Sequence, residues 1–143
     1  MAALTENRST VQMASGDRAG LLGASQTIFA GALLMRNVSG HIIKGATATG
    51  SFGVGRAETA GASTTAGVTN QTFREGIFRY ANSASGDLIA TADIGTVCYI
   101  VDDQTVAKTS GSATRSPAGV VVDVDALGVW VRFDEALTRA MLS

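Results

Sequence analysis

The clearest pattern in the chain is an alternation of apolar and polar residues between Thr96 and Phe133. Because successive side chains of a β-strand point to opposite faces, this two-residue period predicts strands. The pattern is interrupted at Asp102-Asp103 and again at Asp125–Gly128, where Asp and Gly hold the first and fourth positions that a type I turn prefers. The stretch therefore predicts two β-hairpins, and Pro117 stands just before the second one, where its missing N–H does least harm.

Each predicted strand of this stretch has two faces, and both carry apolar residues. We expect one face to form the core, with Val97, Tyr99 and Val101, then Val120, Val122 and Val124, then Val129, Val131 and Phe133. The opposite face carries Cys98, Ile100, Val121, Trp130 and Arg132. Too much of this second face is apolar for simple exposure to water. It is therefore predicted to meet another sheet or another subunit.

Two shorter patterns in the first half of the chain predict further strands. Apolar residues over 26–36, the turn residues Asn37–Gly40 and the short apolar run His41–Lys44 predict a hairpin, although a helix over 26–35 also fits the periodicity. Residues 71–80 predict a strand. Residues 45–69 are almost entirely Gly, Ala, Ser and Thr, so they predict a loop with a flanking strand.

Both ends of the chain differ from its middle. Residues 1–20 are polar and aperiodic, and only a few apolar residues such as Val11 and Met13 interrupt them. This range predicts either a frayed terminus or an arm that becomes ordered on a neighbouring molecule. At the other end, residues 134–142 carry Leu137 and Met141 at helical spacing, which predicts a short terminal helix.

Together these elements predict an all-β fold. Many short strands separated by Gly-rich turns, without alternating helices, are typical of a small β-barrel or β-sandwich. The polar N-terminal arm covers residues 1–20, and residues 21–143 form a single β domain with a short C-terminal helical tail. The total length of 143 residues matches one domain.

Composition narrows the classes of partner. Charged residues make up only 16% of the chain, below the usual quarter, which favours a surface largely occupied by other protein. The net charge of −1 and the scattered basic residues argue against nucleic-acid binding. The longest apolar run, 28–35, is too short to cross a bilayer, and the N-terminus lacks the order of a secretion signal. We therefore expect that the chain is synthesised in the cytoplasm and does not associate with a membrane.

The residues that could carry chemistry do not form a recognisable site. Cys98 and His41 are the only cysteine and histidine, so they cannot supply a zinc site, and a single cysteine excludes an intrachain disulfide. The pairs Asp102-Asp103 and Asp123-Asp125 lie in a predicted turn and on a predicted solvent face. Gly53–Glu58 has Glu where a dinucleotide fingerprint needs its third Gly. We expect no enzyme activity, no cofactor and no metal, and we predict no catalytic, cofactor-binding or metal-binding residue.

The order of the β elements over about residues 73–133 resembles the head decoration (capsid cement) proteins of tailed bacteriophages. The resemblance is carried by Glu75-Gly76-Ile77-Phe78, Gly95–Tyr99, Asp102–Val106, Arg115 with Ala118-Gly119, and Val124–Val131. It implies a small β-barrel or sandwich that binds the outer surface of an icosahedral head after the shell expands. The implied partners are the major capsid protein and the chain itself, as a homotrimer.

The sequence predicts a candidate interface that consists of Val11, Met13, Cys98, Ile100, Trp130 and Arg132. The expected location is the virion, on the outside of the head, where the protein would stabilise contacts between capsomers. Two other interpretations remain open. The chain could be a different virion β-module from a tail, spike or baseplate, or a carbohydrate-binding β-module that uses Trp130 and Tyr99.

Overall fold

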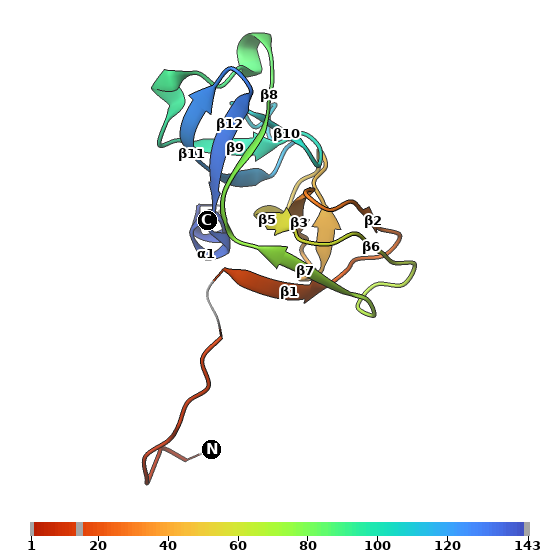
Figure 1. The fold of residues 1–143 in the computed structure, drawn as a ribbon, viewed down its shortest axis with the longest axis vertical. Coiled ribbons are helices and arrows are strands. Elements are labelled where there is room, and N and C mark those ends of the chain that lie inside the picture. The colour runs from red at the N-terminus through yellow and green to blue at the C-terminus, as the bar shows by residue number, and fades with distance from the viewer. Residues whose placement is uncertain (1, 14–15, 142–143) are drawn as a thin grey trace.

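The computed structural model describes residues 2–13 and 16–141, and strands are the main regular elements of the second range (Figure 1). A five-stranded antiparallel sheet lies against a closed five-stranded barrel. The sheet has the order β1-β7-β5-β3-β4, with β1 (Asp17–Leu21), β3 (Leu33–Arg36), β4 (Ile42–Lys44), β5 (Phe52–Ala57) and β7 (Asn70–Arg74). A small two-stranded sheet pairs β2 (Thr27–Ile28) with β6 (Gly61–Ala62).

The barrel holds the second half of the chain. Its order is β10-β8-β12-β11-β9, with β8 (Gly76–Asn82), β9 (Val97–Ile100), β10 (Thr105–Ala107), β11 (Pro117–Asp125) and β12 (Gly128–Phe133). Two short 3-10 turns, Ser85–Asp87 and Thr91–Asp93, lie between β8 and β9. The helix α1 (Glu135–Ala140) follows β12, and the Asp134 carboxylate caps it by accepting from the N–H of Leu137. The prediction of an all-β fold with a short C-terminal helix is confirmed.

The two predicted hairpins of the second half are present as β9–β10 and β11–β12. At the second turn the Asp125 carboxylate accepts from the N–H groups of Leu127 and Gly128, at 2.8 and 3.0 Å. The predicted hairpin of the first half is β3–β4. The strand predicted over 71–80 is divided at Glu75 into β7 and β8, and these belong to different β structures.

Strand β3 joins the two hydrophobic cores. Leu33 and Met35 belong to the core of the barrel, whereas Leu34 belongs to the core of the sheet. All three side chains are fully buried. A strand buried on both faces has no polar face, and this explains why its apolar run fitted a helix as well as a strand.

The faces of β9 are the reverse of those predicted. Cys98 and Ile100 point into the barrel and are fully buried, whereas Val97 and Tyr99 are half-buried on the outside. In β11 a register shift between Val121 and Asp123 breaks the alternation, so that Val121 is buried and Val122 is exposed. Strand β12 follows the prediction, with its valines and Phe133 inside the barrel.

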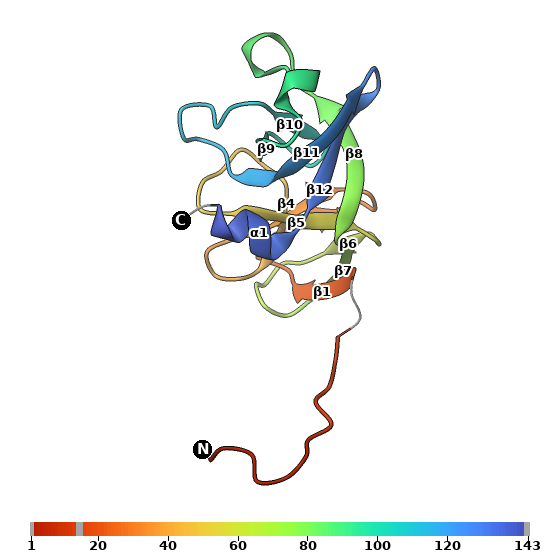
Figure 2. The same ribbon diagram turned by 90° about the vertical axis from the view of Figure 1, so that its left-hand side faces the viewer.

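The N-terminal arm is extended and points away from the rest of the fold (Figures 1 and 2). Every side chain described between Ala2 and Met13 is exposed. Strand β1 begins at Asp17 and pairs with β7, so the last four residues of the range predicted as an arm belong to the sheet.

Candidate functional site

The six residues of the predicted interface do not lie together. Val11 and Met13 are in the exposed arm, with 92% and 71% of their surfaces accessible. Trp130 and Arg132 lie on the outer face of the barrel. The prediction for Cys98 and Ile100 is wrong, because both are enclosed in the barrel core and reach no surface. Burial also raises the pKa of the Cys98 thiol to about 12, so the thiol stays protonated and unreactive in the folded protein.

Trp130 is held in place by the turn of the β11–β12 hairpin. Its indole N–H donates to Oδ2 of Asp125 at 2.9 Å, and the guanidinium of Arg79 lies 5.3 Å from the ring centre. The hydrogen bond from Trp130 lowers the pKa of the Asp125 carboxyl, helped by the N–H of Leu127 and the charge of Arg79. The ring is therefore part of a rigid cluster on the outside of the barrel.

Replacing Trp130 with alanine should destabilise the subunit by about 1 kcal/mol, because the half-buried ring loses its packing and its cation–π contact with Arg79. Urea unfolding of the variant measures this change. Trp130→Phe is the matched control, since it keeps a ring under Arg79 but removes the N–H donor. The control should retain most of the stability, while the pKa of Asp125 rises toward its ordinary value. A Trp130→Ala protein as stable as the wild type would show that the contacts of this ring do not contribute to the stability of the subunit.

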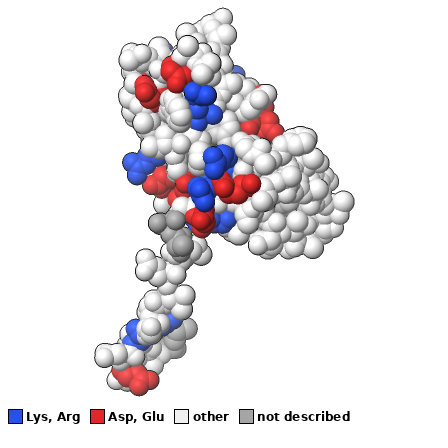
Figure 3. Space-filling view, viewed as in Figure 1, with Lys and Arg blue, Asp and Glu red and all other residues white. Residues whose placement is uncertain are grey.

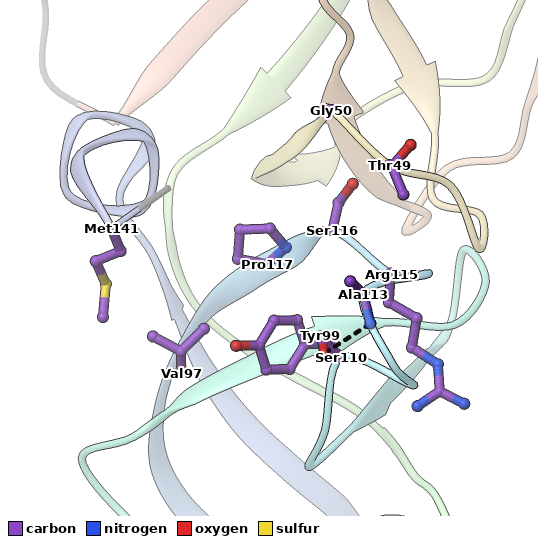
Figure 4. A pocket seen from close by; sticks show the side chains of 10 residues that line it. All are labelled: Thr49, Gly50, Val97, Tyr99, Ser110, Ala113, Arg115, Ser116, Pro117 and Met141. Carbon is purple, nitrogen blue, oxygen red and sulfur yellow. Dashed lines mark hydrogen bonds between the residues drawn. The ribbon is translucent and has the colours of Figure 1, made fainter. Parts of the chain in front are cut away.

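A hollow of about 310 Å³ lies at the far end of α1 (Figure 4). We call it the α1 groove; its lining comprises Thr49, Gly50, Val97, Tyr99, Ser110, Ala113, Arg115, Ser116, Pro117 and Met141. Apolar groups from β9, β11 and the end of α1 form one part of this lining, and hydroxyl groups form the other. The hydroxyl of Ser116 donates to the carbonyl of Ala48 and accepts from the N–H of Ser51, which holds the 46–51 loop beside β11.

One wall of the α1 groove is a short left-handed turn. Gly111, Ser112 and Ala113 have φ values of 61°, 61° and 62°, a conformation that costs non-glycine residues roughly 1–2 kcal/mol each. Ser110 holds the turn: its carbonyl accepts from the N–H groups of Thr114 and Arg115, and its hydroxyl accepts from the N–H of Ala113. Strained backbone of this kind is concentrated at binding and catalytic sites.

Arg115 anchors this turn to the barrel. Its guanidinium donates to the carbonyl of Thr109 at 3.1 Å and pairs with the Asp87 carboxylate at 3.2 Å. Hydrogen bonds from Thr109 and Arg115 lower the pKa of Asp87, with Thr109 the larger cause. The turn that forms the wall is thus fixed to the 3-10 turn Ser85–Asp87 before any partner binds.

The root of the arm is fixed to the opposite end of α1 by an ion-pair network. Arg18 of β1 bridges Glu75 at 3.1 Å and Glu135 of α1 at 3.2 Å, and Arg36 also pairs with Glu135. Partial burial raises the pKa of Glu75, and nearby Asp134 and Glu135 add to this while Arg18 opposes it. Figure 3 shows both signs of charge mixed around the root of the arm. The arm therefore leaves the fold beside the first turn of α1.

The residues considered for a sugar-binding site, and those that could bind a metal ion, do not lie together. Tyr99 lines the α1 groove, whereas Trp130 lies two strands away in the barrel beyond β11, so they do not share one platform for a sugar. Within the two described ranges, no three His, Cys, Asp or Glu side chains gather as metal ligands would. Among the residues placed by the structure, no helix combines the length and apolar character needed to span a bilayer.

Sequence reasoning missed the α1 groove because four separate segments contribute to it. The one local signal was the polar run 109–116, which resembles an ordinary loop. Comparisons with protein-family models, with curated protein sequences and with solved structures returned no match to this chain.

Proposed function

We propose that this chain is a structural virion protein that binds the outside of an icosahedral phage head and stabilises contacts between capsomers. Its partners would be the major capsid protein and further copies of itself, assembled as a homotrimer. The observation that carries this proposal is the exposed arm, which presents Val11 and Met13 to a partner while β1 fixes its root to a β domain.

The fold suits a protein that works by bridging other subunits. A closed barrel exposes few free strand edges, so it resists uncontrolled edge-to-edge association. A segment that becomes ordered only on its partner wraps a large surface with modest affinity at each contact. Several such contacts in one oligomer make later contacts intramolecular, and avidity then exceeds single-site affinity by about 10²–10⁴-fold.

The test is binding of the purified protein to expanded empty heads of the phage that carries this gene. We expect stoichiometric co-sedimentation with expanded heads and little with unexpanded heads, which serve as the matched control. Absence of binding to expanded heads would overturn the proposal. Labelled electron microscopy of complete virions then separates the head from the other location: label on a tail, spike or baseplate would contradict the head assignment.

A further inference from the structure

The arm carries apolar side chains that are largely exposed, although Met13 also lines a hollow with Thr72 and Phe73 of β7. Leu4, Val11 and Met13 are exposed at 70%, 92% and 71%. When the arm is extended, Val11 and Met13 lie on one face, and Thr10 and Gln12 lie on the other. The part of the arm closest to β1 thus presents two apolar side chains about 7 Å apart along one edge, backed by uncharged polar groups.

The α1 groove has the complementary chemistry. Val97, Tyr99, Pro117 and Met141 supply apolar surface, and the hydroxyls of Thr49, Ser110 and Ser116 supply polar groups. Met141 and Leu137, four residues apart on α1, remain 45% and 44% exposed and extend the apolar surface beyond the groove. A volume of 310 Å³ equals roughly ten water molecules at about 30 Å³ each, which suits one or two side chains rather than a larger ligand.

The direction of the arm decides which copy it reaches. Its root is beside Glu135 at the first turn of α1, and the groove lies beside Met141 at the other end of the helix. Both ribbon views show the arm pointing away from the barrel, and therefore away from the groove of its own copy (Figures 1 and 2). Val11 stands six residues before the start of β1, so an extended chain places it up to roughly 20 Å from the sheet, enough to contact a molecule packed beside this one.

We propose that the arm of one copy binds in the α1 groove of a second copy, with Val11 and Met13 packed against its Val97, Tyr99 and Met141. The contact is head-to-tail, so each copy both gives an arm and receives one, and the repeat closes into a ring when the rotation allows. This inference deepens the proposed function by naming the contact that holds the homo-oligomer. The tests below need no phage head, so their failure is distinguishable from a failure to bind heads.

The first test links the two surfaces covalently. Two single variants, Val11→Cys and Val97→Cys, are purified, one of them enlarged by a tag, and then mixed under mild oxidation. Native Cys98 does not compete, because it is fully buried and its thiol pKa is raised to about 12. We expect a disulfide-linked heterodimer of unequal chains on a non-reducing gel. Gln12→Cys is the matched control on the opposite face of the arm, and it should link to Val97→Cys several-fold less.

The double variant Val11→Cys/Val97→Cys distinguishes an arm that binds the groove of a second copy from an arm that binds the groove of its own copy. If each arm binds in the groove of another copy, the linked chains form a ladder that ends at the size of the closed ring. A product that stays at monomer mass, with both thiols consumed, would show that the arm folds back on its own groove and would overturn the proposal. Equal linking of Val11→Cys and Gln12→Cys would overturn it as well.

A second test measures mass in solution by light scattering. The wild type should be an oligomer, and a variant with Val11→Asp and Met13→Asp should be a folded monomer with an unchanged circular dichroism spectrum. A variant with Thr10→Asp and Gln12→Asp adds the same charge on the other face and should keep the oligomeric mass. A monomeric wild type, or an oligomer that survives the first pair of changes, would overturn the inference.

Discussion

Replacing Gly53 with alanine should lower the free energy of unfolding by about 3 kcal/mol, because β5 crosses β11 there without room for a side chain. A Cβ at Gly53 would overlap the carbonyl oxygen of Ala118 and lie 2.8 Å from its carbonyl carbon and 2.9 Å from its Cα. All three atoms belong to backbone, which cannot rotate aside. The sheet and the barrel would therefore have to separate at the point where they touch.

Gly86→Ala is the matched control, since a Cβ there meets no atom within 4 Å and the residue has no positive φ. It should change stability by less than about 1 kcal/mol. Urea unfolding of both variants, followed by circular dichroism, measures the difference. If Gly53→Ala were as stable as Gly86→Ala, the sheet and the barrel would not be in contact through these two strands.

This contact also explains why the small-residue segment 45–69 was hard to interpret from sequence. Glycine and alanine have low strand propensity, so the segment predicted a loop with a flanking strand. The structure places β5 in the middle of the sheet, with Phe52, Val54 and Ala57 buried. Its small residues are explained by the close approach of another backbone, and that approach is set by tertiary structure.

The hairpins were predictable because their turns carry local chemistry. Asp125, for example, accepts from two backbone N–H groups of its own turn. The short helix after β12 was predictable for the same reason, because Asp134 caps it. The inward face of β9 was not predictable, because apolar residues occupy both of its faces. Closure of the barrel decides between them, and it places Cys98 and Ile100 inside. The two residues left half-exposed, Val97 and Tyr99, became lining of the α1 groove.

The surfaces proposed for assembly were only partly visible in the sequence. The apolar interruptions of the arm, Val11 and Met13, stand out in a polar stretch. The α1 groove combines a loop near Thr49, strand β9, the 109–116 run and the last turn of α1. No spacing rule connects segments so far apart in the sequence. The left-handed turn could not be predicted either, because Ser112 and Ala113 are not glycines, the residue type that normally indicates a positive φ.

Replacing Phe133 with alanine should destabilise the protein by about 3–5 kcal/mol, the usual cost of emptying a buried phenylalanine site. Phe133 is 2% exposed and packs against two rings of β8, with centre distances of 6.2 Å to Phe78 and 5.8 Å to Tyr80. The Tyr80 hydroxyl donates to the carbonyl of Gly31 at 2.9 Å, which ties the barrel to the loop before β3. Loss of Phe133 thus loosens the barrel and this connection together.

The measurement is urea unfolding of Phe133→Ala, followed by Trp130 fluorescence and by far-ultraviolet circular dichroism. Leu127→Ala, which removes a side chain 74% exposed at a hairpin turn, is the control and should change stability by less than about 0.5 kcal/mol. Because Leu33 and Met35 of β3 complete the barrel core, the sheet and the barrel should unfold in one transition by both probes. If the barrel of Phe133→Ala melted separately while the sheet remained folded, the two cores would not be coupled through β3.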